Sequence, residues 1–367
     1  MNKAYINEIS IKSVCGDIDK TFDAMLNKQT SLKVYSEIVP EKEVCIGKFD
    51  VNSSFKKLLQ NSVEEVLIAS NLKDFSSTLL LVGSSVGGMA TSEEIFFKEN
   101  SYKNIDVKKH IVHSIASLLD DKFHFFSTRS FSTACTSSAN ALKTAKELIS
   151  IGAYKNILVV GADQICMTTI FGFSSLGILN DEVCTPFQQN RKGMNVAEGI
   201  GVLLLQDEKQ KNSIELIGAG TSSDAFHIAN PDPTAQGAKS AILNALKDAS
   251  LSPNQIDYIN AHGTGTNAND AIEAKAVSEI FPKDIFISST KPTIGHTLGA
   301  AGAIEACICT EVLKKGMLIP QIKQNDYEVA LNFVENAKKK NLQYVMSNSF
   351  AFGGNNVSLI FGVPCES

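Results

Sequence analysis

The chain has 367 residues, of which 44% are hydrophobic, and its formal net charge is −5. This length allows one large or two medium domains with a substantial core, and the acidic balance disfavours nucleic acid as the main partner. The longest apolar runs, such as Leu79–Val82 and Ile200–Leu205, are far shorter than the roughly 20 residues that span a bilayer, and the N-terminus lacks a secretion signal. The eight cysteines are scattered, so we expect a cytoplasmic protein with reduced thiols, no membrane span and no nucleic-acid partner.

Short apolar runs typical of strands alternate with segments typical of helices along most of the chain. The expected strands are 79–82, 157–161, 201–205, 214–216, 256–260, 285–288, 343–346 and 357–361. The expected helices are 137–145, 237–249, 270–280 and 300–313. Helices that separate short, nearly all-apolar strands predict an α/β fold whose sheets are covered on both faces.

The two halves of the chain contain similar elements in the same order. In each half a strand leads through a turn with a reactive side chain into a helix of small residues, first at Cys135 and then at His296. We therefore expect two similar α/β halves, 1–207 and 208–367, which meet at the polar turn 207–212. The alanines and glycines of the two helices predict close helix packing at the centre of the molecule.

Cys135 lies in Phe-Ser-Thr-Ala-Cys-Thr-Ser-Ser-Ala-Asn-Ala-Leu (131–142), where a strand end and a tight turn lead into a helix. Ser137, Ser138 and Asn140 can supply capping groups, and the free N–H groups and dipole of the helix start favour a thiolate. A free cysteine is more often a small buried hydrophobic residue, so the turn alone leaves both interpretations open.

Two histidines at other strand ends favour the reactive interpretation. His262 lies in Asn-Ala-His-Gly-Thr-Gly-Thr (260–266), and His296 lies in Thr-Lys-Pro-Thr-Ile-Gly-His (290–296). The small residues around them predict imidazoles that face a cleft, although a hydrogen-bonded turn histidine is an equal alternative for His262. In Ser-Asn-Ser-Phe-Ala-Phe-Gly-Gly (347–354), two aromatics precede a turn where backbone can approach a ligand. One thiol and two imidazoles suit acyl transfer through a thioester.

The four motifs in combination resemble those of the elongating β-ketoacyl-[acyl-carrier-protein] synthases, condensing enzymes of the thiolase superfamily. The resemblance runs from about residue 79 to residue 362. It implies a thiolase-like fold, in which two α/β halves form a five-layer α-β-α-β-α sandwich. It also implies a decarboxylative Claisen condensation in fatty-acid-type chain elongation: Cys135 takes an acyl group, and His262 and His296 stabilise the enolate formed when malonyl-[acyl-carrier-protein] loses carbon dioxide. Both imidazoles would have to be neutral to act as donors in this way.

The resemblance also implies roles for aromatic residues and backbone groups around the nucleophile. The backbone N–H groups of Cys135 and Phe352 would form the oxyanion hole. Phe352, Phe350 and Phe173 would gate and line an acyl tunnel, although plain core packing is the better interpretation of Phe173 taken alone.

Polar residues of the two histidine motifs receive roles in the same way. Thr264 and Thr266 match hydroxyls that bind the pantetheine arm. Lys291 matches the active-site lysine of the family and would pair with Asp270 or Glu273. A purely structural ion pair is an equal interpretation of this lysine.

A set of oxygen-bearing side chains matches the ligands of a structural monovalent cation found in some members of the family. These residues are Asn260, Glu305, Ser347 and Asn348. Three neutral oxygens and one carboxylate suit sodium or potassium better than a transition metal. The reaction itself would require no cofactor.

The expected partner is an acyl carrier protein that delivers the acyl and malonyl thioesters. Lys56 and Lys57 lie where family members present a basic docking patch, although two such lysines are more often just a solvated helix face. The resemblance implies a homodimer, with a heterodimer of this chain and a paralogue as the alternative.

Some segments depart from the family pattern. The first 75 residues match poorly, 267–269 reads Asn-Ala-Asn where a proline or glycine is usual, and Asn355 replaces a common threonine. The tracts 190–199 and 265–270 are more similar to ketosynthases of bacterial polyene-pigment pathways than to lipid enzymes.

These features leave two further functions as alternatives. One is a polyketide or aryl-polyene ketosynthase with the same chemistry, and the other is a non-catalytic partner subunit that sets chain length, which the presence of Cys135 disfavours. Initiating synthases use Cys-His-Asn, so His296 argues against them. Degradative thiolases need a second cysteine in Cys-x-Gly, a context that Cys365 lacks.

Overall fold

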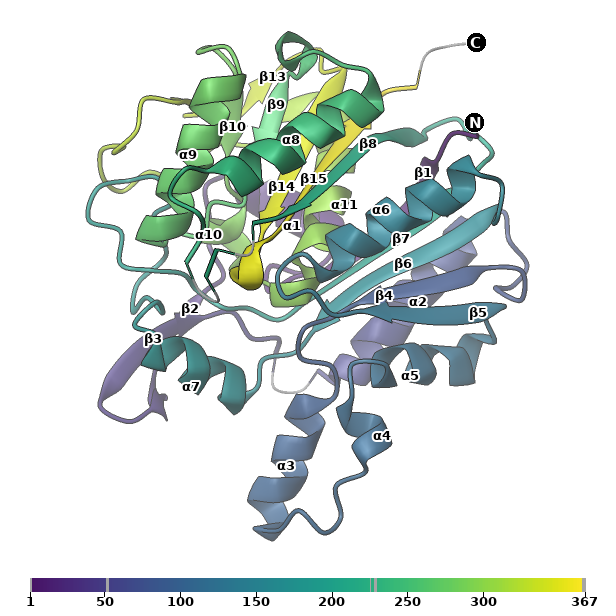
Figure 1. Ribbon diagram of the computed structural model, residues 1–367. Coiled ribbons are helices and arrows are strands. Elements are labelled where there is room, and N and C mark those ends of the chain that lie inside the picture. The colour runs from purple at the N-terminus through teal and green to yellow at the C-terminus, as the bar shows by residue number, and fades with distance from the viewer. Residues whose placement is uncertain (1, 51–52, 225, 228–229, 365–367) are drawn as a thin grey trace.

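A computed structural model of the chain describes residues 2–50, 53–224, 226–227 and 230–364. Among these residues, eleven strands form one mixed sheet in the order β12-β10-β9-β14-β15-β8-β1-β7-β6-β4-β5 (Figure 1). Their bounds are β1 Tyr5–Lys12, β4 Leu79–Gly83, β5 Ser127–Phe131, β6 Asn156–Asp163, β7 Gly199–Gln206, β8 Ile214–Ser223, β9 Tyr258–Asn260, β10 Phe286–Ser288, β12 Asn332–Phe333, β14 Tyr344–Phe350 and β15 Asn355–Gly362. β2 Lys33–Val39 and β3 Lys42–Ile46 form a hairpin, and β11 Met317–Leu318 pairs with β13 Lys338–Lys339 in a separate two-stranded sheet.

Helices cover both faces of this sheet. The helices are α1 Ile18–Leu26, α2 Phe55–Ala69, α3 Met89–Glu99, α4 Val107–His110, α5 Ser114–Phe123, α6 Ser137–Ser150, α7 Met167–Ser175, α8 Gln236–Ala249, α9 Asn267–Ile280, α10 Lys291–Ile294 and α11 Ala301–Lys315. Short 3-10 turns occur at Pro253–Gln255, Leu298–Ala300 and Phe352–Gly354. Within the described ranges, none of the helices has the length and apolar character needed to cross a bilayer.

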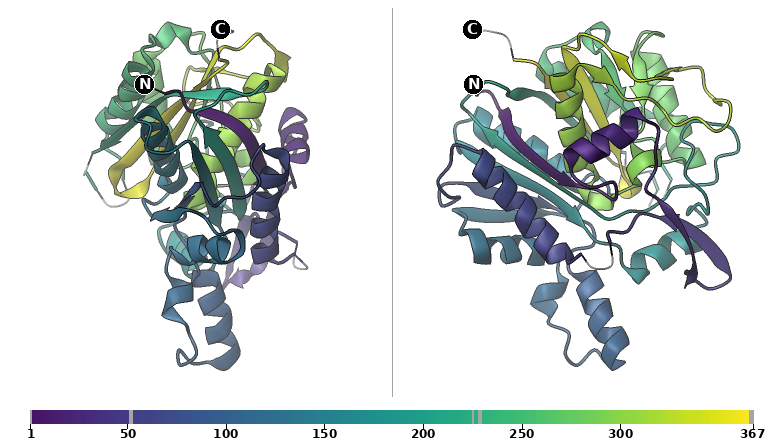
Figure 2. Two further views of the ribbon diagram at one scale, coloured as in Figure 1. Left: turned by 90° about the vertical axis from the view of Figure 1, so that its right-hand side faces the viewer. Right: turned by 180° about the vertical axis from the view of Figure 1, so that it is seen from behind.

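The alternation of side chains along the strands produces the layers. In β4, Leu79 and Leu81 pack in the central cluster with α6 and α11, whereas Leu80 and Val82 pack against α2 and α5. In the other half, Ile259 of β9 faces the cluster formed by α8 and α9. The order α2/α5, sheet, α6/α11, sheet, α8/α9 confirms the expected thiolase-like, five-layer α/β arrangement (Figures 1 and 2).

Small residues let the two central helices lie close together, as the sequence predicted. A Cβ added to Gly302 of α11 would lie 2.7 Å from the Cβ of Ala139 in α6. The hydroxyl oxygen of Ser138 also accepts a hydrogen bond from the N–H of Ala303 at 2.9 Å. The helix that follows the cysteine and the helix that follows His296 are therefore locked to each other.

Strand β1 joins the two halves of the sheet, and the sequence patterns did not predict it. It pairs antiparallel with β7 along its length and with β8 at Tyr5 and Ile6. Polar Asn7, Glu8 and Ser10 interrupt its apolar pattern, which explains why it was missed. The expected boundary between residues 207 and 208 falls in the turn between β7 and β8.

Candidate active site

The turn that carries Cys135 connects β5 to α6 and is held by its own side chains. Ala134 has a left-handed φ of 51°, a conformation that costs of the order of 1–3 kcal/mol for a residue with a side chain. The N–H of Thr133 donates to Ser137 Oγ at 2.9 Å, and the Ser137 hydroxyl donates to the carbonyl of Ala134 at 2.6 Å. This bonded, left-handed turn places Cys135 at the rim of a cavity.

The charge state expected for Cys135 needs a correction. Its side chain is partly exposed to the cavity, yet the surrounding protein removes enough hydration to raise the pKa of the thiol to about 12. The Lys291 ammonium opposes this shift and the Asp163 carboxylate adds to it. The expectation that the helix start favours a thiolate is therefore wrong for the resting site, because desolvation outweighs the nearby positive charge.

His296 lies beside the cysteine with a defined tautomer. Its Nε2 is 3.1 Å from Cys135 Sγ, across 161 residues of sequence. The backbone N–H of Leu298 points at His296 Nδ1 at 3.2 Å, so Nδ1 accepts and the proton must lie on Nε2. His296 is consequently placed to donate a hydrogen bond to the sulfur or to an oxygen that takes its place.

Two carboxylates of α9 hold the loop that carries His262. Glu273 accepts the backbone N–H groups of His262 and Gly263, each at 2.8 Å. Asp270 accepts the N–H of Gly265 at 3.2 Å. Gly263 and Gly265 have φ values of 37° and 83°, which a side chain would strain. The loop therefore depends on both acids and both glycines for its shape.

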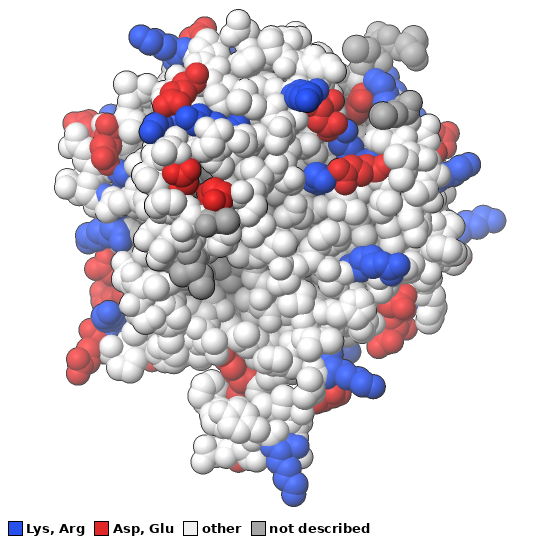
Figure 3. All heavy atoms as spheres, viewed as in Figure 1, with Lys and Arg blue, Asp and Glu red and all other residues white. Residues whose placement is uncertain are grey.

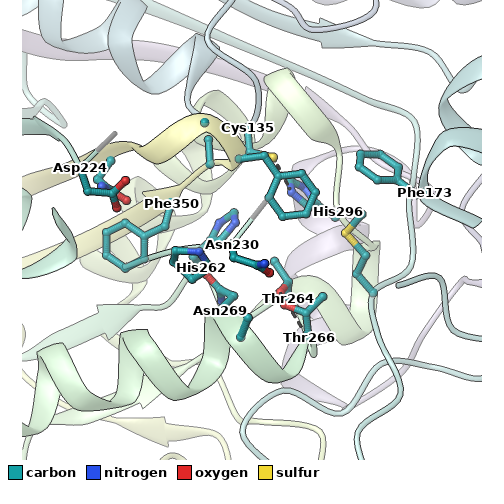
Figure 4. A pocket seen from close by; sticks show the side chains of 17 residues that line it. Cys135, Phe173, Asp224, Asn230, His262, Thr264, Thr266, Asn269, His296 and Phe350 are labelled. Atoms are coloured by element: carbon teal, nitrogen blue, oxygen red, sulfur yellow. Dashed lines mark hydrogen bonds between the residues drawn. The ribbon is translucent and has the colours of Figure 1, made fainter. Parts of the chain in front are cut away.

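The thiol and the two imidazoles lie close together and line the same cavity (Figure 4). The ligand atoms of Cys135, His262 and His296 lie within 4.8 Å of one another, and the two imidazole rings are perpendicular with centroids 5.2 Å apart. Burial and the nearby Lys291 ammonium lower the pKa of both histidines well below 6.5. Both imidazoles are therefore neutral near pH 7, in agreement with the expectation for enolate-stabilising donors.

The structure corrects the expected partner of Lys291. Its Nζ lies 2.6 Å from Glu305 Oε1, and both side chains are buried, whereas Asp270 and Glu273 bind the histidine loop instead. The ion pair thus joins α10 to α11. Its Lys291 ammonium is a source of positive charge for Cys135, His262 and His296 alike.

Two of the oxygens expected around a cation are available to a ligand. Asn260 Oδ1 and Glu305 Oε2 are buried and have no hydrogen-bond partner among the described residues. Ser347 Oγ accepts a bond from Asn260 Nδ2 at 3.2 Å, and Asn348 Oδ1 already accepts one from Ser358. The residues therefore fit a cation in part, through an orphaned carboxylate oxygen and an orphaned amide oxygen.

The two threonines of the histidine loop line the cavity on the same side as His262. Their hydroxyl oxygens are 2.9 Å apart, and the N–H of Thr266 donates to Thr264 Oγ1 at 3.3 Å. The remaining hydrogen-bonding capacity of these hydroxyls faces the cavity, where an amide-bearing substrate arm could use it.

Three phenylalanines surround the cysteine in different ways. Phe352 and Phe173 lie 6.2 Å apart between ring centroids, and together with Cys135 they line both the cavity of the histidines and a second cavity beside α7. Phe350 packs edge-on against His262 at 6.2 Å and belongs to the core cluster around α8 and α9. Phe352 and Phe173 thus separate two cavities that meet at the sulfur.

Sequence reasoning missed a buried arginine that supports the histidine loop. Arg191 Nε is 3.5 Å from Asp270 Oδ2, and its NH2 group donates to the carbonyl of Asn267 at 3.3 Å. Its NH1 group also contacts Glu328. Arg191 lies in the tract 190–199, which the sequence analysis used only for its similarity to ketosynthases of polyene-pigment pathways. Cys365 lies outside the described residues.

Comparisons with known proteins agree with this arrangement. Residues 53–211 match the model of the β-ketoacyl synthase N-terminal domain, and residues 214–325 match that of the C-terminal domain. A protein from Schizosaccharomyces pombe, named as a mitochondrial 3-oxoacyl-[acyl-carrier-protein] synthase, is 30% identical over 352 residues, covering 86% of this chain and 82% of its own. A 3-oxoacyl-[acyl-carrier-protein] synthase 2 from Staphylococcus aureus is 35% identical, but the match covers only 62% of this chain and 61% of the relative.

A solved structure matches nearly the whole chain. It is the complex of a ketosynthase with its chain length factor from Xenorhabdus doucetiae, with a TM-score of 0.90, 31% identity, and coverage of 99% of this chain and 98% of the matched chain. The chain therefore belongs to the β-ketoacyl synthase family. It is an enzyme of the 3-oxoacyl-[acyl-carrier-protein] synthase class.

Proposed function

We propose that this enzyme condenses a Cys135-bound acyl group with malonyl-[acyl-carrier-protein], forming 3-oxoacyl-[acyl-carrier-protein] and carbon dioxide. The observation that carries the proposal is the position of Cys135 Sγ, 3.1 Å from His296 Nε2 and within 4.8 Å of a ring nitrogen of His262. A nucleophile, two neutral donors and a shared cavity are the groups that this reaction needs.

In the first step, Cys135 Sγ attacks the carbonyl carbon of an acyl thioester. The new carbon–sulfur bond replaces the one to pantetheine, and the pantetheine sulfur leaves with the thiol proton. The backbone N–H groups of Cys135 and Phe352 stabilise the oxyanion. Because the pKa of Cys135 is about 12, proton loss from the thiol accompanies attack rather than preceding it.

In the second step, the malonyl group takes its place beside the two imidazoles. Its carbon–carbon bond to the carboxylate breaks, carbon dioxide leaves, and the electron pair passes into an enolate whose oxygen accepts hydrogen bonds from His262 and His296. The enolate carbon then attacks the acyl group on Cys135. That carbon–carbon bond forms as the carbon–sulfur bond breaks, and the cysteine thiol is restored by protonation.

Intact-mass analysis tests this proposal directly. The protein is incubated with an acyl-[acyl-carrier-protein], and the acyl mass is expected on Cys135 and absent from a Cys135→Ala variant. Addition of malonyl-[acyl-carrier-protein] must then remove the adduct and produce the 3-oxoacyl product. Condensation by Cys135→Ala at the normal rate would refute the proposal.

A second candidate is polyketide or aryl-polyene synthesis by the same chemistry. The observation that favours it is the likeness to a structure solved as a ketosynthase with its chain length factor. Competition between saturated and polyunsaturated acyl thioesters for Cys135 separates the two pathways. Acceptance of saturated groups alone would remove the second candidate.

A dimer fits the outer face of the N-terminal half. Strand β5 is an edge of the large sheet, and Phe126 directly precedes it. Phe126 and three residues of α3, the α3–α4 loop and α4, namely Phe97, Tyr102 and Val107, are between 64% and 74% exposed. A second copy or a paralogue covers this apolar surface in the proposed assembly. Light scattering of the purified chain distinguishes a homodimer from a monomer that awaits a paralogue.

The acyl carrier protein docks through basic residues in this proposal. Lys56 and Lys57 are both exposed on the first turn of α2 and can meet an acidic partner. A charge reversal of both lysines should slow acylation by the carrier-bound substrate and leave acylation by a small thioester unchanged.

The proposal includes a structural sodium or potassium ion beside the buried Lys291–Glu305 pair. Asn260 Oδ1 and Glu305 Oε2 would hold it, with Ser347 and Asn348 beside them. Lys291 contacts only Oε1 of Glu305, so such an ion would balance the negative charge on Oε2. Replacement of both alkali cations by a bulky organic cation should then lower the melting temperature.

A further inference from the structure

Asp163, the last residue of β6, is a buried carboxylate that the proposed steps do not use. Figure 3 shows other acidic side chains at the surface of the molecule, where water can satisfy their oxygens. Asp163 is 0% exposed, so its oxygens depend on donors within the protein. It lies outside the linings of the two cavities that meet at Cys135, and contact with substrate is therefore not its role.

The donors to this carboxylate come from two segments that are far apart in the sequence. The loop that follows β4 gives three hydrogen bonds to Oδ1, from the Ser84 hydroxyl at 2.5 Å and from the N–H groups of Ser85 and Val86 at 3.1 and 2.9 Å. The N–H of Gly299 donates to Oδ2 at 2.7 Å. One carboxylate thus joins a loop of the N-terminal half to a turn of the C-terminal half.

On one side, the carboxylate holds the turn that orients His296. Leu298 has a left-handed φ of 52°, which a residue with a side chain adopts only where the surrounding structure enforces it. Its own N–H points at His296 Nδ1 at 3.2 Å, and the next N–H along the chain, that of Gly299, is bound to Asp163. Asp163 therefore anchors the turn that keeps the proton of His296 on Nε2.

On the other side, the carboxylate holds the loop that supports the cysteine turn. Ser85, whose N–H binds Asp163, donates its hydroxyl to the carbonyl of Ala134 at 2.9 Å. Ala134 is the left-handed residue directly before Cys135. The distance of 3.1 Å between Cys135 Sγ and His296 Nε2 is thus set from both sides by hydrogen bonds that meet at Asp163.

The charge of Asp163 favours a positioning role over activation of the thiol. Burial raises the pKa of Asp163 to about 6, so the group is a carboxylate near pH 7. Desolvation is the main cause of the raised pKa of Cys135, and the Asp163 carboxylate raises it further, so this charge opposes formation of the thiolate. A carboxylate instead supplies two oxygens that accept several donors, which an amide with one oxygen and two N–H donors cannot match.

We propose that Asp163 is a positioning residue for both steps of the condensation, because it holds Cys135 and His296 at a fixed separation. It acts on the sulfur through the loop 84–86 and on the imidazole through the turn Leu298–Ala300. This inference rests on the proposed condensation and adds a residue that acts without touching the substrate.

Separate measurements of acylation and decarboxylation test this inference with two variants. Asp163→Asn presents N–H donors to groups that are themselves donors, so acyl transfer to Cys135 and carbon dioxide release from malonyl-[acyl-carrier-protein] should both fall about tenfold or more. The substrate concentrations for half-maximal rate should stay within about twofold, since Asp163 lines neither cavity. Ser85→Ala removes only the hydroxyl bond to Ala134, so it should slow acyl transfer about fivefold and leave decarboxylation within about twofold.

The tautomer of His296 gives a readout that a loss of stability alone would not change. In ¹⁵N NMR spectra of histidine-labelled protein, with signals assigned through a His296→Gln variant, the unaltered enzyme should carry the proton on Nε2. Asp163→Asn should show a mixture of both tautomers, because the N–H of Leu298 is no longer held against Nδ1. The matched controls are Asp257→Asn, at a carboxylate that accepts two backbone N–H groups just before β9, and Ser117→Ala, at a hydroxyl that donates to a backbone carbonyl on α5. Neither control should alter the rates or the tautomer.

The outcomes separate the role of Asp163 from the function on which it rests. No acylation or condensation by the unaltered enzyme would remove the proposed function itself. Normal condensation by that enzyme combined with full rates in Asp163→Asn, or slower rates with an unchanged His296 tautomer, would overturn the positioning role alone. Unchanged acyl transfer in Ser85→Ala, or an equal loss of decarboxylation in that variant, would also overturn it, even where Asp163→Asn fails to fold.

Discussion

The region that carries the histidines and the region around α7, where we propose that the acyl group binds, are built differently. His262 and His296 are only 2% and 1% exposed, and the His262 loop is bonded to Glu273 and Asp270. On the acyl side, Phe171 and Leu176 of α7 are 41% and 53% exposed. The histidines are therefore enclosed and held by hydrogen bonds, whereas α7 leaves apolar side chains accessible to a second chain or a ligand.

Removal of the sulfur should have the largest effect and should separate the two regions. Cys135→Ala is expected to reduce condensation roughly a thousandfold or more, because no acyl group can be held. Decarboxylation of malonyl-[acyl-carrier-protein] should persist, since both imidazoles remain. Product analysis and carbon dioxide release measure the two steps, and circular dichroism checks the fold. Simultaneous loss of decarboxylation in a folded variant would show that the regions do not act separately.

The reciprocal change is made in the histidine region. His262→Ala is expected to slow decarboxylation about a hundredfold through loss of one donor to the enolate oxygen. Acylation of Cys135 should stay near normal, because His262 is not needed in the first step. His113→Ala, at an exposed histidine on the N-terminal side of α5, is a control that should change neither rate. An equal loss of acylation in His262→Ala would contradict the division of labour.

The buried ion pair should govern stability in the histidine region. Glu305→Gln leaves the Lys291 ammonium buried without a counter-charge, which is expected to lower the free energy of unfolding by about 3–5 kcal/mol. Glu147→Gln, which breaks an exposed helix pair with Lys143, should cost only about 0.5 kcal/mol. Urea denaturation measures both. Equal effects would mean that the buried pair has no special weight.

The pH dependence of cysteine alkylation tests the charge state of the resting site. Since the pKa of Cys135 is raised to about 12, the reactive thiolate is a small fraction that grows with pH. Iodoacetamide modification of Cys135 should accelerate about tenfold per pH unit between about pH 7 and 10, without a plateau. Peptide mass spectrometry measures the rate at this cysteine alone. A plateau near neutral pH would show that the thiolate is stabilised after all. Lys291→Met should slow the reaction further, because its ammonium lowers the pKa.

The smallest effect is expected where a carboxylate acts only through the loop it holds. Asp270→Asn weakens the hydrogen bonds to the loop and the ion pair with Arg191. A loss of about 1 kcal/mol in the binding of malonyl-[acyl-carrier-protein] should raise the concentration that gives half the maximal rate roughly fivefold. Acylation of Cys135 should not change. Asp19→Asn, on a side chain that is 81% exposed, is the control. Slower acylation in Asp270→Asn would show that the effect spreads beyond the histidine loop.

Local patterns predicted most of the buried elements. The runs at 79–82, 157–161 and 201–205 became β4, β6 and β7, because nearly continuous apolar runs are typical of strands covered on both faces. Strand β1 was missed because its buried positions include polar residues that depend on distant partners. Asn7 Nδ2, for example, donates to Gln206 at 2.7 Å.

The sequence by itself determined the class of chemistry, since a thiol and two imidazoles in small-residue turns after strands have few other uses in combination. Tertiary structure alone decided how those groups are charged and paired. It placed Lys291 against Glu305 rather than the acids of α9, and it raised the pKa of Cys135 that the local turn would have lowered. The physical reason is that motifs act over neighbouring residues, whereas desolvation and ion pairing depend on which distant segments enclose a site.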